Sequence, residues 1–117
     1  MKLKLKLFVE HEGATFEFKY LDWVLPTAIE VFKGITEEQM DSLKAEMMDI
    51  TIIPPNLIMI CNDVFKESLI GWKDVFDEED NPVEFSAETR ELVDPISRLN
   101  IGVKILQEMI EIDEKKV

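Results

Sequence analysis

The chain contains very few of the residues that bind metals, form disulfides or hold phosphates. Among 117 residues there are one cysteine, Cys61, and one histidine, His11. One cysteine excludes an internal disulfide, and one Cys with one His cannot complete a structural zinc site. The four glycines are scattered and form no phosphate-binding loop. We therefore expect no metal site and no cofactor.

Positive charge is also scarce, because 13 Lys and Arg oppose 25 Asp and Glu, which leaves a formal net charge of −12. Nucleic-acid backbones and anionic membranes are bound by positive surfaces, so we expect neither as a partner. The most apolar window, residues 50–61, is broken by Pro54 and Pro55 and is shorter than the about 20 residues of a membrane-spanning helix. With no signal-peptide pattern after Met1, these absences predict a cytoplasmic protein.

The acidic residues are concentrated in one segment. Residues 74–94 contain nine acidic residues and one Arg, a net −8 that is two-thirds of the total charge. Asp77, Glu79 and Asn81 alternate as at the start of an EF-hand calcium loop. Pro82, however, stands where that loop requires its turn glycine. We interpret the segment as an acidic loop in contact with solvent, followed by a helix.

The first 21 residues predict a β-hairpin. Lys and Leu alternate from residue 2, and Phe16, Phe18 and Tyr20 alternate with polar residues in the second strand. Gly13 lies between the two strands, where it can adopt a positive φ. Because a lone hairpin is marginal in water, its apolar face must pack on helices or on strands of another chain.

The remainder, residues 22–117, predicts four to five helices. Their starts are marked by Pro26, Thr36, Pro55, Ser86 and Asp94. The expected helices cover 26–33, 36–50, 55–69 (with Gly71-Trp72 ending it), a short stretch from 87, and 95–114. The whole chain, 1–117, is therefore expected to be one α+β domain. It consists of an N-terminal antiparallel β-hairpin and a small bundle of four to five α-helices, with an acidic loop at 73–85.

The last predicted helix has an apolar arc wider than the single stripe of an ordinary surface helix. One sector contains Ile96, Leu99, Val103, Leu106 and Ile110. The adjoining sector contains Ile101, Ile105, Met109 and Ile112. The second sector is covered either by another segment of the same domain or by a partner protein, and the sequence leaves both readings open.

No pair of residues has the pattern of a nucleophile and its base. His11 lies in the predicted hairpin turn between Glu10 and Glu12, where a surface histidine is the ordinary outcome. Cys61 falls on the apolar stripe of a predicted helix, where a free cysteine packs as a small apolar residue. We therefore expect that the protein is not an enzyme.

Residues 68–110 combine several features in a characteristic order. These are Gly71-Trp72 followed by Lys73-Asp74-Val75, the acidic stretch 77–82, the helix start 83–88 with Phe85-Ser86, the pair Leu92-Val93 and a long apolar terminal helix. This block resembles the small tail assembly chaperones of long-tailed phages. The alternating N-terminal hairpin is also similar to the β-rich start of several such families.

The resemblance implies a non-enzymatic role in tail morphogenesis in the host cytoplasm. Tail assembly chaperones coat the long tape measure protein, keep it soluble and help recruit tail tube subunits. The implied partners are the tape measure protein and, as a further candidate, the tail tube protein; a homo-oligomer is left open. A chaperone needs exposed apolar surface to bind its client, and strong like charge to keep the coated complex soluble.

We expect the partner-binding residues around the acidic loop and on the terminal helix. They are Trp72, Val75, Phe85, Ile101, Ile105, Met109 and Ile112. Trp72 is either a core anchor, with Val75 and Phe85 beside it, or a hot spot for a partner. Two other functions remain: a structural tail completion or connector protein that pairs by strand addition, and an acidic DNA mimic that inhibits a basic partner.

Overall fold

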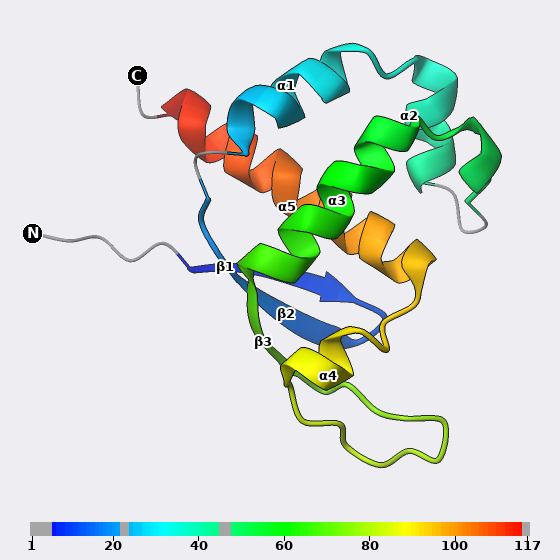
Figure 1. Ribbon diagram of the computed structural model, residues 1–117, viewed down its shortest axis with the longest axis vertical. Helices are drawn as coiled ribbons and strands as arrows, with labels where there is room; N and C mark the ends of the chain where they lie inside the picture. Colours follow the sequence, from blue (N-terminus) through cyan, green and yellow to red (C-terminus); the bar gives the residue numbers. More distant parts are fainter. Residues whose placement is uncertain (1–5, 22–23, 45–47, 116–117) are drawn as a thin grey trace, which may run out of the picture.

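The alternating N-terminal residues form the expected hairpin, and a further strand joins it. The computed structural model describes residues 6–21, 24–44 and 48–115. Within these residues, strands β1 (Lys6–His11), β2 (Ala14–Lys19) and β3 (Leu69–Lys73) form one antiparallel sheet in the order β1-β2-β3 (Figure 1). The expected first strand residues, 2–5, lie outside the described residues. The α+β class predicted from the sequence is confirmed.

The hairpin turn consists of Glu12 and Gly13, with φ values of 50° and 82°. Two consecutive positive φ values are typical of the tight turns whose twist matches that of the flanking strands. The turn sets the register, in which Leu7 pairs with Phe18 and Val9 with Phe16. These four side chains are buried on one face of the sheet, so the alternation in the sequence places the apolar set toward the helices.

Strand β3 corrects the sequence-based expectation that a helix ends at Gly71-Trp72. Helix α3 (Pro55–Ser68) ends at Ser68, and the chain continues directly into the strand, where Trp72 pairs with Phe16. The buried Ser68 hydroxyl donates to the carbonyl of Lys19 at 2.5 Å, which ties the end of α3 to the end of β2. The open edge of β2 supplies the pairing that local sequence could not reveal.

The other described helices are α1 (Leu25–Lys33), α2 (Glu37–Lys44), the short 3₁₀ helix η1 (Ile50–Ile52), α4 (Ala87–Arg90) and α5 (Pro95–Lys115). The capping box of α2 is confirmed, because the Thr36 and Gln39 side chains each accept from the other's backbone N–H. The helix predicted to reach Ile50 is wrong at its end: residues 48–49 are not helical and Ile50 begins η1, while 45–47 lie outside the described residues.

Helices α3 and α5 cross one face of the sheet and supply nearly half of the buried core residues (Figure 1). At their crossing Gly102 approaches Cys61 so closely that a β-carbon on Gly102 would lie 2.6 Å from Cys61 Cβ. Burial raises the pKa of the Cys61 thiol to about 12, so this cysteine is an unreactive packing residue. The close contact lets both helices cover the sheet together.

Candidate functional site

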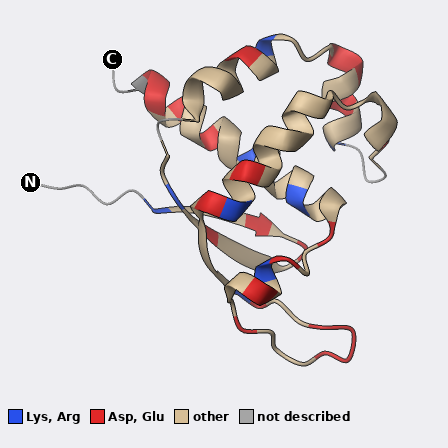
Figure 2. Ribbon diagram, viewed as in Figure 1, with Lys and Arg blue, Asp and Glu red and all other residues tan. Residues whose placement is uncertain are grey.

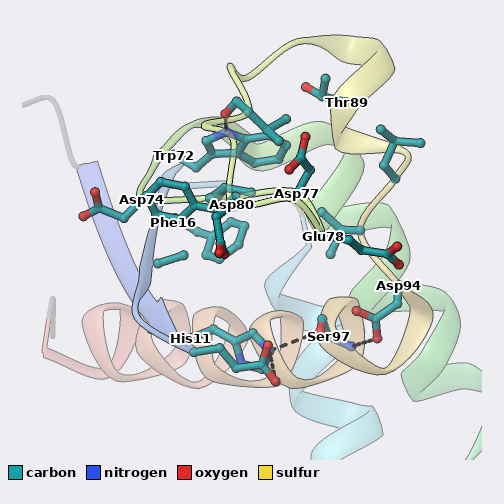
Figure 3. Close-up of a pocket in the computed structure, with 17 residues that line it drawn as sticks. His11, Phe16, Trp72, Asp74, Asp77, Glu78, Asp80, Thr89, Asp94 and Ser97 are labelled. Carbon is teal, nitrogen blue, oxygen red and sulfur yellow. Dashed lines mark hydrogen bonds and ion pairs between the residues drawn. The ribbon is translucent and has the colours of Figure 1, made fainter.

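A groove of about 720 Å³ lies between the hairpin turn, the loop that follows β3 and the start of α5 (Figure 3). Its apolar lining includes Phe16, Trp72, Val75, Phe76, Leu92 and Val93. Its acidic lining consists of Glu12, Asp74, Asp77, Glu78, Asp80 and Asp94. Three segments that are distant in the sequence therefore meet at one concave surface, which we call the acidic groove.

The loop between β3 and α4 forms the upper wall of the acidic groove as drawn in Figure 3. Asp77 Oδ1 accepts the backbone N–H groups of Glu79 and Asn81, each at 2.9 Å, and Asp77 N–H donates to the Asn81 carbonyl at 2.9 Å. Val83 N–H donates to the Val75 carbonyl at 2.8 Å. These bonds fold the expected acidic loop into a hairpin-like arm, and Figure 2 shows its Asp and Glu residues along the arm.

Trp72 fixes the base of this arm. Its indole N–H donates to the Val83 carbonyl at 2.8 Å, and its ring makes edge-to-face contacts with Phe16 and Phe85, with centroids 5.9 and 5.1 Å away. Such pairs stabilise beyond the area that they bury. These contacts are those of a core anchor. Trp72 and Val75 line the groove, whereas Phe85 packs on the Trp72 ring and is not part of the lining.

The opposite wall is formed by the hairpin turn and the first turn of α5. His11 Nε2 and Ser97 Oγ lie 3.1 Å apart, and the Asp94 carboxylate accepts the Ser97 backbone N–H at 3.0 Å as the N-cap of the helix (Figure 3). The contact between His11 and Ser97 joins residues 86 positions apart, so the sequence contained no signal for it. The contact between His11 and Ser97 links β1 to α5, and Asp94 holds the first turn of α5 by capping it.

Two of the groove carboxylates are held in the charged state. Partial burial raises the pKa of Asp94, but hydrogen bonds from Ser97 and the charge of His11 outweigh it, so this pKa lies below its usual value. The backbone hydrogen bond from Asn81, opposed by slight desolvation and supported by Glu79, lowers the pKa of Asp77. Both groups therefore remain ionised throughout the neutral and mildly acidic range.

The most exposed apolar side chains of the groove, Phe76 and Leu92, are not among the predicted partner-binding residues. Leu92 is 78% exposed and Phe76 is 54% exposed, and both contribute to the groove lining. The sequence feature that could have identified them is the presence of large apolar side chains within a strongly acidic segment. Val75, Phe85 and Val93 of the same segment pack against the core, so exposure is confined to particular apolar residues of the segment.

The predicted partner-binding residues on the terminal helix α5 lie in the core and not on a free surface. Ile101, Ile105 and Met109 are fully buried, and Ile112 is partly buried against the core. The structure thus corrects the expectation of a free apolar face at these four positions. Strand β1 and helices α1 and α3 contact α5, so the domain itself covers most of both apolar sectors; Ile96, at the start of the helix, stays exposed.

Other chemistry finds little support in the described residues. No group of three or more His, Cys, Asp or Glu side chains within them is arranged to hold a metal ion. The same part of the chain has no helix of the length and hydropathy needed to cross a membrane. The chain matches no protein-family model, and no curated protein or solved structure is similar to it at the level of significance required.

Proposed function

We propose that the chain is a tail assembly chaperone of a long-tailed phage. In this proposal it binds the tape measure protein, keeps it soluble and helps recruit tail tube subunits in the host cytoplasm. The observation that supports the proposal is the acidic groove. The block that resembles the chaperones, from Gly71-Trp72 to Leu92-Val93, supplies most of the groove, including the exposed Phe76 and Leu92.

A holding chaperone needs two properties that oppose each other on an ordinary surface. It needs apolar side chains that a client can contact, and like charge that keeps the loaded complex from associating further. Residues 74–94 combine a net charge of −8 with the two exposed apolar side chains. The proposal therefore assigns client contact to this segment and not to α5, whose apolar residues beyond Ile96 are mostly buried in the core.

Co-expression with a candidate tape measure protein tests this proposal. We expect the client to move from the insoluble to the soluble fraction and to co-purify with the chain. Leu92→Ser should reduce the soluble yield, because it removes an exposed apolar contact. Met59→Ser is the matched control, since Met59 is 67% exposed on α3 and does not line the acidic groove. Absence of both co-purification and solubilisation with the wild-type chain would refute the chaperone role.

A structural tail component remains the second candidate, because β1 lies at an edge of the sheet formed by the described residues. One feature opposes strand addition there: Lys104 Nζ donates to the backbone carbonyl of Glu10 at 3.2 Å, and lysines commonly protect edge strands. The protein should be absent from purified virions if it is a chaperone and present if it is a connector. The DNA-mimic alternative is less favoured, because the charge gathers around one groove.

A further inference from the structure

We propose that the acidic groove binds a partner segment in which Lys or Arg side chains flank apolar side chains. The inference rests on the proposed function only in taking the tape measure protein as the source of that segment. It follows from three properties of the groove: its large excess of negative charge, its apolar lining and its hydrogen-bonded walls.

Little within the described chain offsets the negative charge of the groove: among the lining residues, only His11 can carry a positive charge, and its Nε2 lies 3.9 Å from a carboxylate oxygen of Glu12. None of the described residues that line it is Lys or Arg. The described arginines nearest in sequence are engaged elsewhere: Arg90 donates to the Lys66 carbonyl, and both Arg90 and Arg98 lie within ion-pair distance of Glu91. A positively charged segment of a partner protein would therefore complement the negative charge of the groove.

The apolar lining excludes a purely ionic ligand. Phe76 and Leu92 are more than half exposed at the groove, and Val75, Val83 and Val93 lie beside them in the lining. A volume of about 720 Å³ accommodates several side chains, within the usual size range of binding pockets. An apolar segment alone would desolvate the surrounding carboxylates without pairing them, which is unfavourable. Apolar side chains flanked by Lys or Arg satisfy both parts of the surface.

The two walls hold the charges in place before a partner arrives. The loop wall is fixed by the Asp77 hydrogen bonds and by the indole of Trp72, and the opposite wall by the contact between His11 and Ser97. Figure 3 shows Asp74, Asp77 and Asp80 on the loop wall and Asp94 on the opposite wall. A preorganised surface loses less conformational entropy on binding than a mobile one. The acidic groove is thus suited to binding a partner segment, in addition to keeping the protein soluble.

Three labelled peptides of one length test the inference against the full chain by fluorescence anisotropy. The first peptide consists of alternating blocks of Lys and of Leu, each about one helical turn long. The second peptide has Glu in place of each Lys, and the third has Ser in place of each Leu. We expect the Lys/Leu peptide to bind at least about tenfold more tightly than either of the others, and its affinity to fall as salt is raised. Equal affinity for the Lys/Leu and Glu/Leu peptides would overturn the inference.

Variants then place the binding in the groove. Leu92→Ser and the double variant Asp74→Asn with Glu78→Gln should each weaken binding of the Lys/Leu peptide several-fold. The controls are Met59→Ser and the double variant Asp63→Asn with Glu67→Gln, which make the same chemical changes on the exposed side of α3. Equal losses in groove variants and controls would show general attraction to an acidic protein and would overturn the site. Thermal melts establish that each variant is folded.

The inference and the proposed function fail in different ways. If the Lys/Leu peptide binds the groove but the tape measure protein is not solubilised, the groove inference stands and the chaperone role fails. If the tape measure protein is solubilised equally well by wild type and by both groove variants, the chaperone role stands and the groove inference fails.

Discussion

The two sides of this molecule use apolar residues in opposite ways. On the helical side, most of the wide apolar arc of α5 is covered by the sheet, α1 and α3, and Ile105 is fully buried. On the groove side, Phe76 and Leu92 stay exposed although the segment around them is the most acidic of the chain. A long helix can be covered along its length by neighbouring elements, whereas a short arm that projects from a sheet edge has little behind it. The number of apolar residues therefore does not indicate which surface is free.

The largest effect is expected on the helical side. Ile105→Ala should lower the free energy of unfolding by about 4 kcal/mol, because it removes a fully buried side chain and leaves a cavity. Urea denaturation measures this change. Ile96→Ala, on the same helix but 44% exposed, should cost about 1 kcal/mol or less. Similar losses in the two variants would mean that α5 does not lie against the core as the structure has it.

Trp72 joins the two sides, and its replacement should have the next largest effect. Trp72→Ala should destabilise by about 3 kcal/mol, at the low end for a large aromatic residue because the ring is partly exposed. Trp72→Phe retains a ring but loses the N–H donor to Val83, so about 1 kcal/mol is expected. Thermal and urea denaturation of both variants measure these losses in stability. Unchanged stability in Trp72→Ala, with loss of client binding, would instead make Trp72 a hot spot.

The crossing of α3 and α5 offers a test of intermediate size. Gly102→Ala should destabilise by about 2 kcal/mol, because the new β-carbon would meet Cys61 Cβ. Adding Cys61→Gly removes the atom that it meets and should restore part of the loss, although glycine inside a helix costs about 1 kcal/mol. A double-mutant cycle measures the coupling. Additive losses would show that the helices do not approach each other at this point.

The smallest predicted effect concerns a charge at the edge of the helical side. Partial burial, together with the neighbouring Glu111, raises the pKa of Glu108. The folded state thus binds the proton more tightly than the unfolded chain, and stability increases as pH falls through the raised pKa. Glu108→Gln should stabilise by about 0.2–0.5 kcal/mol at neutral pH, as expected for relief of a like-charge pair on a helix.

The same substitution should have no effect below about pH 4, where Glu108 of the wild type is itself protonated. Urea midpoints at the two pH values measure the difference. Asp63→Asn on α3 removes one negative charge from an exposed site and serves as the control for net charge. A gain that persists unchanged in acid would exclude an electrostatic origin.

Local chemistry allowed several elements to be predicted well. The hairpin turn at Gly13, the capping box of Thr36 with Gln39, and the N-caps Ser86 and Asp94 are all present as expected. Each depends on residues within a few positions of one another. Strand β3 and the acidic groove depend on contacts such as Trp72 with Phe16 and His11 with Ser97, which no local pattern contains.

The sequence by itself determined the α+β class, the helix starts and the concentration of negative charge in residues 74–94, because each follows from composition or from spacing along the chain. Only the tertiary structure decided which apolar residues remain exposed. Burial is a property of the elements that pack together, and the partners of α5 and of the arm after β3 come from distant parts of the chain. The acidity from which we expect no nucleic-acid partner surrounds an apolar groove in the folded chain.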